Sequence, residues 1–174
     1  MPSKRHSIRQ VPAVLEELRR RLQGRVVVVG VGNELRGDDG FGPAVIERLR
    51  GRVVADLLDC GEVPESYLGR IISLTPDSIL VVDAVDLDAA PGAMALLEPD
   101  DLVDKLGFTH SPTLGLFLKF LENETGAKAT ILGVQPGSRA LGEGLSASVA
   151  ASADAVCALL TSALPRRREH TNVQ

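Results

Sequence analysis

Residues 26–50 read VVVVGVGNELRGDDGFGPAVIERLR, in which four consecutive valines lead into a glycine-rich loop and then into a helical segment. A continuous β-branched run that ends in glycine is typical of a central parallel strand covered on both faces. Pro43 suits the first turn of a helix running to Arg50, and Gly51 suits its C-terminal stop. The stretch therefore predicts a strand, a loop and a helix, which is the repeating unit of an α/β domain.

The rest of the chain continues this alternation. Apolar runs and turn signals predict further strands at 53–59, 79–83, 93–97 and 129–134, and helices at 11–23, 64–74, 99–102, 111–124 and 146–163. About ten residues separate the strand at 79–83 from the strand at 93–97, too few for a parallel crossover, so the second is expected to be an antiparallel edge strand. The predicted fold is an α/β three-layer sandwich: a mostly parallel, twisted five-stranded sheet with one antiparallel edge strand and helices on both faces.

A chain of 174 residues fits a single domain. We expect an N-terminal helical extension over 1–24, a core over 25–164 and a mobile tail over 165–174. The extension should pack on the core, because an isolated 13-residue helix is marginal in water. Its apolar stripe consists of Val11, Val14, Leu15, Leu18 and Leu22.

Composition excludes several classes of partner. A net charge of −4, with no Trp, one Tyr and four Phe, disfavours nucleic acid, which needs basic and aromatic surfaces. The most apolar segment, 145–164, carries Asp154 and several hydroxyl residues, so a buried helix is a better interpretation than membrane insertion. Cys60 and Cys157 are too few for a disulfide framework or a zinc site, and free thiols without an export signal indicate a cytoplasmic protein. The oligomeric state is not set by these features.

The glycine loop after the first strand does not fit a dinucleotide fingerprint. That fingerprint needs a third glycine where Leu35 stands and a helix beginning there. Asp38 and Asp39 would also repel a phosphate. We therefore assign no cofactor-binding residues to the loop.

The loop can instead contribute to a metal site. Ligands of open α/β sheets gather beyond the carboxyl ends of the strands. Asp38 and Asp39 follow the first strand, Asp83 ends the third, and His110 precedes a helix that returns to the sheet. If the first and third strands are neighbours, these side chains can converge, and an Asp/Asp/His set suits a first-row divalent ion. The alternatives are that Asp39 caps the following helix, that Asp83 binds loop amides and that His110 is a surface residue.

No common nucleophile motif is present, since neither Gly-x-Ser-x-Gly nor His-Glu-x-x-His occurs. Cys60 could pair with His110 as a thiol nucleophile, although a buried, inert thiol is the favoured interpretation. His6 and His170 lie in the tails, which leaves His110 as the histidine placed for core chemistry.

Five separated motifs resemble those of one protein family. They are Gly30-Val31-Gly32-Asn33-Glu34-Leu35-x-x-Asp38-Asp39-Gly40-x-Gly42, Asp59-Cys60-Gly61-x-x-Pro64-Glu65, Leu80-Val81-Val82-Asp83-Ala84 with Pro91-Gly92, Thr109-His110-Ser111, and Leu132-Gly133-Val134-Gln135-Pro136. In this order they are similar to the [NiFe]-hydrogenase maturation endopeptidases, and most similar to the branch that processes formate-hydrogenlyase-type large subunits. Cys60 stands where glycine is usual in that family.

The resemblance implies a function. Members remove a C-terminal extension from the [NiFe]-hydrogenase large-subunit precursor, their partner, after nickel insertion, and they are classed as aspartic-type peptidases. Their catalytic and metal-contacting residues carry over to Asp39, Asp83 and His110. The implied cofactor is nickel, presented by the precursor and weakly bound by the free enzyme. A noncatalytic nickel-binding maturation chaperone with the same ligands remains the alternative.

Overall fold

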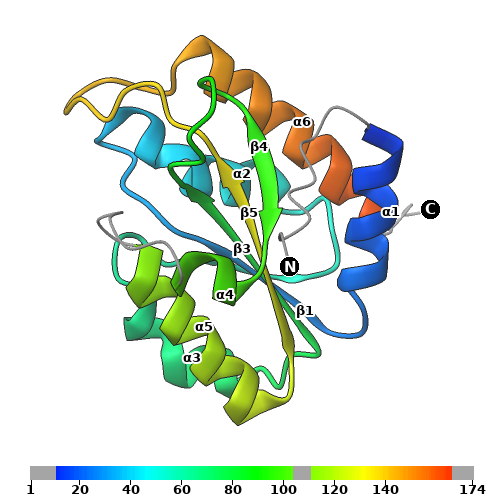
Figure 1. Cartoon of the computed structure of the whole chain (residues 1–174). Helices are drawn as coiled ribbons and strands as arrows, with labels where there is room; N and C mark the ends of the chain where they lie inside the picture. Colours follow the sequence, from blue (N-terminus) through cyan, green and yellow to red (C-terminus); the bar gives the residue numbers. More distant parts are fainter. Residues whose placement is uncertain (1–10, 104–110, 166–174) are drawn as a thin grey trace, which may run out of the picture.

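The computed structural model describes residues 11–103 and 111–165, which form a five-stranded sheet between two layers of helices (Figure 1). The strands are β1 (Val26–Gly30), β2 (Asp56–Asp59), β3 (Ser78–Ala84), β4 (Met94–Leu97) and β5 (Lys128–Val134). Their order across the sheet is β2-β1-β3-β5-β4. All neighbours are parallel except β4, which is antiparallel to β5 at one edge. The predicted architecture, including its antiparallel edge strand, is confirmed.

The valines of β1 show why this strand lies inside the sheet. Val26 and Val28 are buried in the core on one face, and Val27 and Val29 in the core on the other. The first face is covered by α1 (Val11–Arg21), α2 (Phe41–Leu49) and α6 (Ala147–Ala163), and the second by α3 (Leu68–Ser73), α4 (Pro99–Val103) and α5 (Ser111–Thr125) (Figure 1). A strand covered on both sides needs an apolar side chain at every position, which is why its sequence is continuous instead of alternating.

Three boundaries differ from the prediction. The second strand pairs with β1 only from Asp56 onward, because the Val54 amide donates to the Pro165 carbonyl (2.7 Å) after α6. The helix expected over 64–74 divides into a 3₁₀ turn, η2 (Pro64–Tyr67), and the short α3. The helix that follows β1, α2, begins at Phe41, two residues before Pro43. Pro43 is therefore the third residue of the helix, still in its first turn, where a backbone N–H would have no helical partner.

The N-terminal helix α1 packs against α6 as part of the first core, as predicted from its apolar stripe. Val14, Leu18 and Leu22 are buried, and Leu15 is partly buried against the same cluster. The side chain of Val11 lies outside those that the structure describes. Gly24 ends the turn after the helix at φ +65°, where a Cβ would overlap the Asp77 side chain. The glycine stop inferred from the sequence is therefore a conformational and steric requirement.

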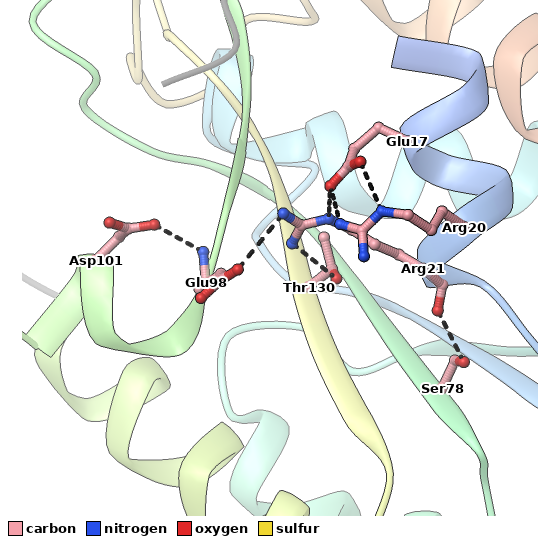
Figure 2. A network of polar contacts seen from close by, with 7 residues as sticks. All are labelled: Glu17, Arg20, Arg21, Ser78, Glu98, Asp101 and Thr130. Atoms are coloured by element: carbon pink, nitrogen blue, oxygen red, sulfur yellow. Dashed lines mark hydrogen bonds and ion pairs between the residues drawn. The ribbon is translucent and has the colours of Figure 1, made fainter. Parts of the chain in front are cut away.

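Polar contacts fasten the C-terminal end of α1 to the sheet (Figure 2). Arg21 pairs with Glu17 (2.5 Å) and extends to Thr130 of β5 and to Glu98 after β4, both at 3.5 Å. Ser78, the first residue of β3, donates its hydroxyl to the Arg21 carbonyl (3.0 Å). These anchors lie at the amino-terminal ends of β3 and β5, so α1 is attached to the end of the sheet opposite the carboxyl ends of the parallel strands.

The apolar segment considered for membrane insertion forms α6, a buried helix, as predicted. Val149, Val156 and Leu160 are fully buried in the first core. Within the described residues, none of the helices combines the length and apolar character that crossing a membrane requires.

Candidate functional site

The candidate site begins where β1 and β3 end side by side. These strands are parallel neighbours with Gly30 paired to Val82, and the Val31 amide donates to the Val82 carbonyl (3.0 Å) just beyond them. The loop that follows β1 folds back tightly over this edge. A Cβ at Gly42 would overlap the carbonyl oxygens of Val31 and Val82, and one at Gly32, where φ is +134°, would overlap the Asp39 carbonyl oxygen. The signature glycines thus permit the close approach that carries Asp39 to the end of β3.

Asp39 lies in the 3₁₀ turn η1 (Gly37–Gly40), with 21% of its side chain exposed. Its carboxylate accepts the Asn33 amide (3.2 Å) and pairs with the guanidinium of Arg139, with 3.6 Å between Nε and Oδ1. The residue that precedes α2 is Gly40, and no side chain caps that helix. Asp39 is therefore not the helix cap that the sequence left open, and its carboxylate remains partly accessible.

Asp83 is partly buried at the carboxyl end of β3, one residue past the pairing of Val82 with β1. The pKa of Asp83 is raised to about 8, mainly by burial and then by the negative charge of Asp39, against the opposing effects of the Ala84 amide and the Arg139 guanidinium. Asp39 is thus close enough for its negative charge to disfavour the charged form of Asp83. The structure brings Asp39 and Asp83 together as the topology predicted.

His110 lies outside the described residues, so its convergence with the two carboxylates stays a prediction. Among residues 11–103 and 111–165, no group of three or more His, Cys, Asp or Glu side chains is arranged to hold a metal ion. Among the described residues, metal binding by the Asp39–Asp83 pair therefore stays a prediction.

Asp38, the residue before Asp39, binds a different segment of the chain, and the sequence analysis did not predict this contact. It is fully buried and accepts hydrogen bonds from the amides of Gly137 (2.7 Å), Ser138 (3.0 Å) and Ser146 (2.6 Å) and from the Ser146 hydroxyl (2.9 Å). Burial alone would raise the pKa of Asp38, but these donors hold it below its ordinary value. Asp38 therefore fixes the loop over residues 135–146, and the only hint in the sequence was that loop's richness in glycine and serine.

That loop places Arg139 over the carboxylate pair, a second feature that sequence reasoning missed. Besides its ion pair with Asp39, Arg139 donates from Nη2 to the Ala84 carbonyl (3.2 Å). An arginine in a loop without apolar periodicity gives no sign of such a position. The position of Arg139 can be recognised only from the pairing of β3 with β5, because the loop that carries it follows β5 directly and so begins beside the end of β3.

Cys60 has the properties of the inert thiol favoured from the sequence. It is buried in the second core, and its amide donates to the Gly30 carbonyl (2.9 Å). Burial, followed by the charge of Asp59, raises the pKa of the Cys60 thiol to about 12, so the reactive thiolate is essentially absent at neutral pH.

Comparison with known proteins assigns the chain to a family. Residues 43–163 match the family model described as hydrogenase maturation protease. The chain is 33% identical over 113 residues to the hydrogenase 3 maturation protease of Escherichia coli, covering 63% of this chain and 72% of that protein, and 32% identical over 125 residues to the hydrogenase 2 maturation protease of the same organism, covering 66% and 74%.

Solved structures agree with this result. The crystal structure of the [NiFe] hydrogenase maturation protease HycI from Thermococcus kodakarensis superimposes with a TM-score of 0.79 at 33% identity, covering 85% of this chain and 98% of that one. The named relatives are proteases, which supports a peptidase over a noncatalytic chaperone. With the described fold, the glycine loop and the family match in agreement, this chain belongs to the hydrogenase maturation proteases.

Proposed function

We propose that this protein is the endopeptidase that removes the C-terminal extension of a [NiFe]-hydrogenase large-subunit precursor once nickel has been inserted. Membership of the maturation protease family supports the reaction class. The observation that carries the proposal for the site is the Asp39–Asp83 pair at the carboxyl ends of two adjacent parallel strands. Such ends are where α/β domains bind their ligands. We place the reaction in the cytoplasm, where free thiols such as Cys60 and Cys157 stay reduced.

The chemistry of the donor set fits a divalent metal. A cation between the two carboxylates would offset the repulsion that Asp39 exerts on the charge of Asp83, and with the imidazole of His110 they would form a set suited to first-row ions. Thiolates bind nickel strongly, but the thiol of Cys60 is buried and protonated. We therefore propose that Asp39, Asp83 and His110 bind nickel weakly in the free protein and engage the ion that the precursor carries.

Each residue of the pair has a separate task in an aspartic-type reaction. Nickel, when bound, supplies a Lewis acid that can polarise the scissile carbonyl or activate water. Asp39 is held in position by the hydrogen bond that its carboxylate accepts from the Asn33 amide. Asp83, with a pKa of about 8, holds a proton at neutral pH and can give it to the leaving amine or release it to become a ligand. Docking of the precursor's metal would also orient the scissile segment, so cleavage would wait for correct metal insertion.

The test is processing of nickel-loaded and nickel-free precursor by the wild type and by Asp39→Asn and His110→Ala, with precursor length read by mass spectrometry. Asp39→Asn preserves side-chain volume and should keep the fold while abolishing cleavage, and His110→Ala should do nearly the same. Asp88→Asn, an exposed loop position after β3, serves as the matched control and should process normally. Equal cleavage of the nickel-free precursor would contradict nickel gating, and full activity in Asp39→Asn would contradict the site.

A further inference from the structure

The guanidinium of Arg139 bridges the two segments that form the candidate site. Its Nε lies 3.6 Å from Asp39 on the loop after β1, and its Nη2 donates to the carbonyl of Ala84 at the end of β3. A positive group therefore already lies beside the place where two carboxylates converge. Because a guanidinium is charged at every accessible pH, this compensation is permanent while the side chain stays there.

The backbone that carries Arg139 is firmly placed, whereas its side chain is not. Asp38 binds the amides of Gly137 and Ser138 on one side, and the Gly142 amide donates to the Leu35 carbonyl (2.8 Å) on the other. The Arg139 side chain itself is 44% exposed and makes one long ion pair and one hydrogen bond. Partly exposed ion pairs of this kind are weak, so the side chain can swing into solvent without moving its loop.

We propose that Arg139 is an internal counter-ion that occupies the cation position of the Asp39–Asp83 pair and must move aside before a divalent metal binds. The inference rests on the proposed function of that pair. A divalent ion is repelled by the arginine twice as strongly as a monovalent one, so Arg139 disfavours entry of loose metal in particular. An ion delivered by the precursor arrives with its own protein contacts, which can offset the displacement. Arg139 is thus a positioning residue that makes the free enzyme a poor metal binder.

The experiment measures Ni²⁺ binding by calorimetry at pH 8.5 for the full-length wild type, Arg139→Gln, Arg139→Lys and Arg36→Gln. Arg139→Gln should bind Ni²⁺ about fivefold more tightly, the order expected from losing one partly exposed charge next to the site. Arg139→Lys keeps the charge and should bind like the wild type. Arg36→Gln removes an equal charge from the glycine loop, at a position paired with Leu141, and should leave the affinity unchanged because Arg36, unlike Arg139, is not among the groups that shift the pKa of Asp83.

Unchanged or weaker binding in Arg139→Gln would overturn the inference, and so would undetectable binding in both Arg139→Gln and the wild type, because Arg139 would then not be what excludes the ion. An equal gain in Arg139→Lys would overturn it too, since the effect would come from the lost bond to Ala84 and not from charge. Cleavage by Asp39→Asn tests the proposed function separately. Asp39→Asn can fail to process precursor while Arg139→Gln leaves nickel affinity unchanged, and that result would remove only the counter-ion.

Discussion

Replacing Asp83 with asparagine should make the protein more stable at pH 8 while abolishing precursor processing. The Asp83 carboxyl has a pKa of about 8 in the folded protein, against 3.8 for an unperturbed group. Between these values the folded state binds a proton that the unfolded state has released, so the free energy of unfolding falls as pH rises. Asparagine carries no charge at any pH and does not incur this loss.

The magnitude follows from the size of the pH window. Each pH unit in which the two states differ by one proton changes the free energy of unfolding by about 1.36 kcal/mol, so three units, from pH 5 to pH 8, give at most about 4 kcal/mol. Asp83 is partly exposed, and solvent screening should reduce the effect to about 2 kcal/mol. For a chain of this size that corresponds to about 4–8 °C in melting temperature.

The assay is urea and thermal unfolding of wild type and Asp83→Asn at pH 5, 6, 7 and 8. The advantage of the variant should grow with pH and be smallest at pH 5. Asp86→Asn changes a neighbouring carboxylate in the loop after β3 and should reproduce the pH dependence of the wild type. A variant that is less stable than the wild type at pH 8, or an advantage that does not change with pH, would refute the reasoning.

Four further substitutions and one deletion test the supports of the site and of the fold. Asp38→Ala leaves several buried donors of the 135–146 loop unpaired and should cost about 3 kcal/mol in chemical unfolding, with faster amide hydrogen exchange in that loop. Leu18→Ala removes a fully buried side chain of α1 and should lower the free energy of unfolding by about 3 kcal/mol. Deletion of residues 1–23 should lower the melting temperature while cleavage at low temperature persists. An unchanged melting temperature would show that α1 does not stabilise the core. Gly42→Ala should abolish or severely destabilise folding, measured by circular dichroism, whereas Gly144→Ala, where a Cβ meets open space, should be neutral.

The sequence predicted the fold well because the strongest signals are local. The valine run of β1 could only be a strand covered on both faces, and the short connection before β4 left room only for an antiparallel strand. The predicted start of the second strand at residue 53 was wrong because Val54 bonds instead to Pro165, over a hundred residues away. A local sequence pattern gives no information about a contact between residues so far apart in the chain.

The site was predictable only in part for a related reason. Strand order places the ends of β1 and β3 side by side, which the sequence analysis could state only as a condition, and the glycine loop then carries Asp39 to the end of β3. Asp38 and Asp39 are the same residue type at adjacent positions, and the 3₁₀ turn that sends one into the site and the other into a late loop has no distinctive pattern. Arg139 reaches the pair only through that loop, so it could not be identified before the tertiary contacts of Asp38 were known.

The hydrogen bonds of Asp38 to the 135–146 loop also determine when, during synthesis, the glycine loop can reach its final shape. When Asp39 leaves the ribosome, the strand β5 and the loop that carries Arg139 have yet to be synthesised, because they lie about a hundred residues later. Chains are made at roughly 5–20 residues per second, so several seconds separate the first carboxylate from its surroundings. During that interval Asp38 has none of its native donors, and the glycine loop cannot hold its final shape. A chain still in synthesis therefore carries every residue of the glycine loop before the segment that fixes it, and the candidate site takes its final shape only when the last third of the protein has been made.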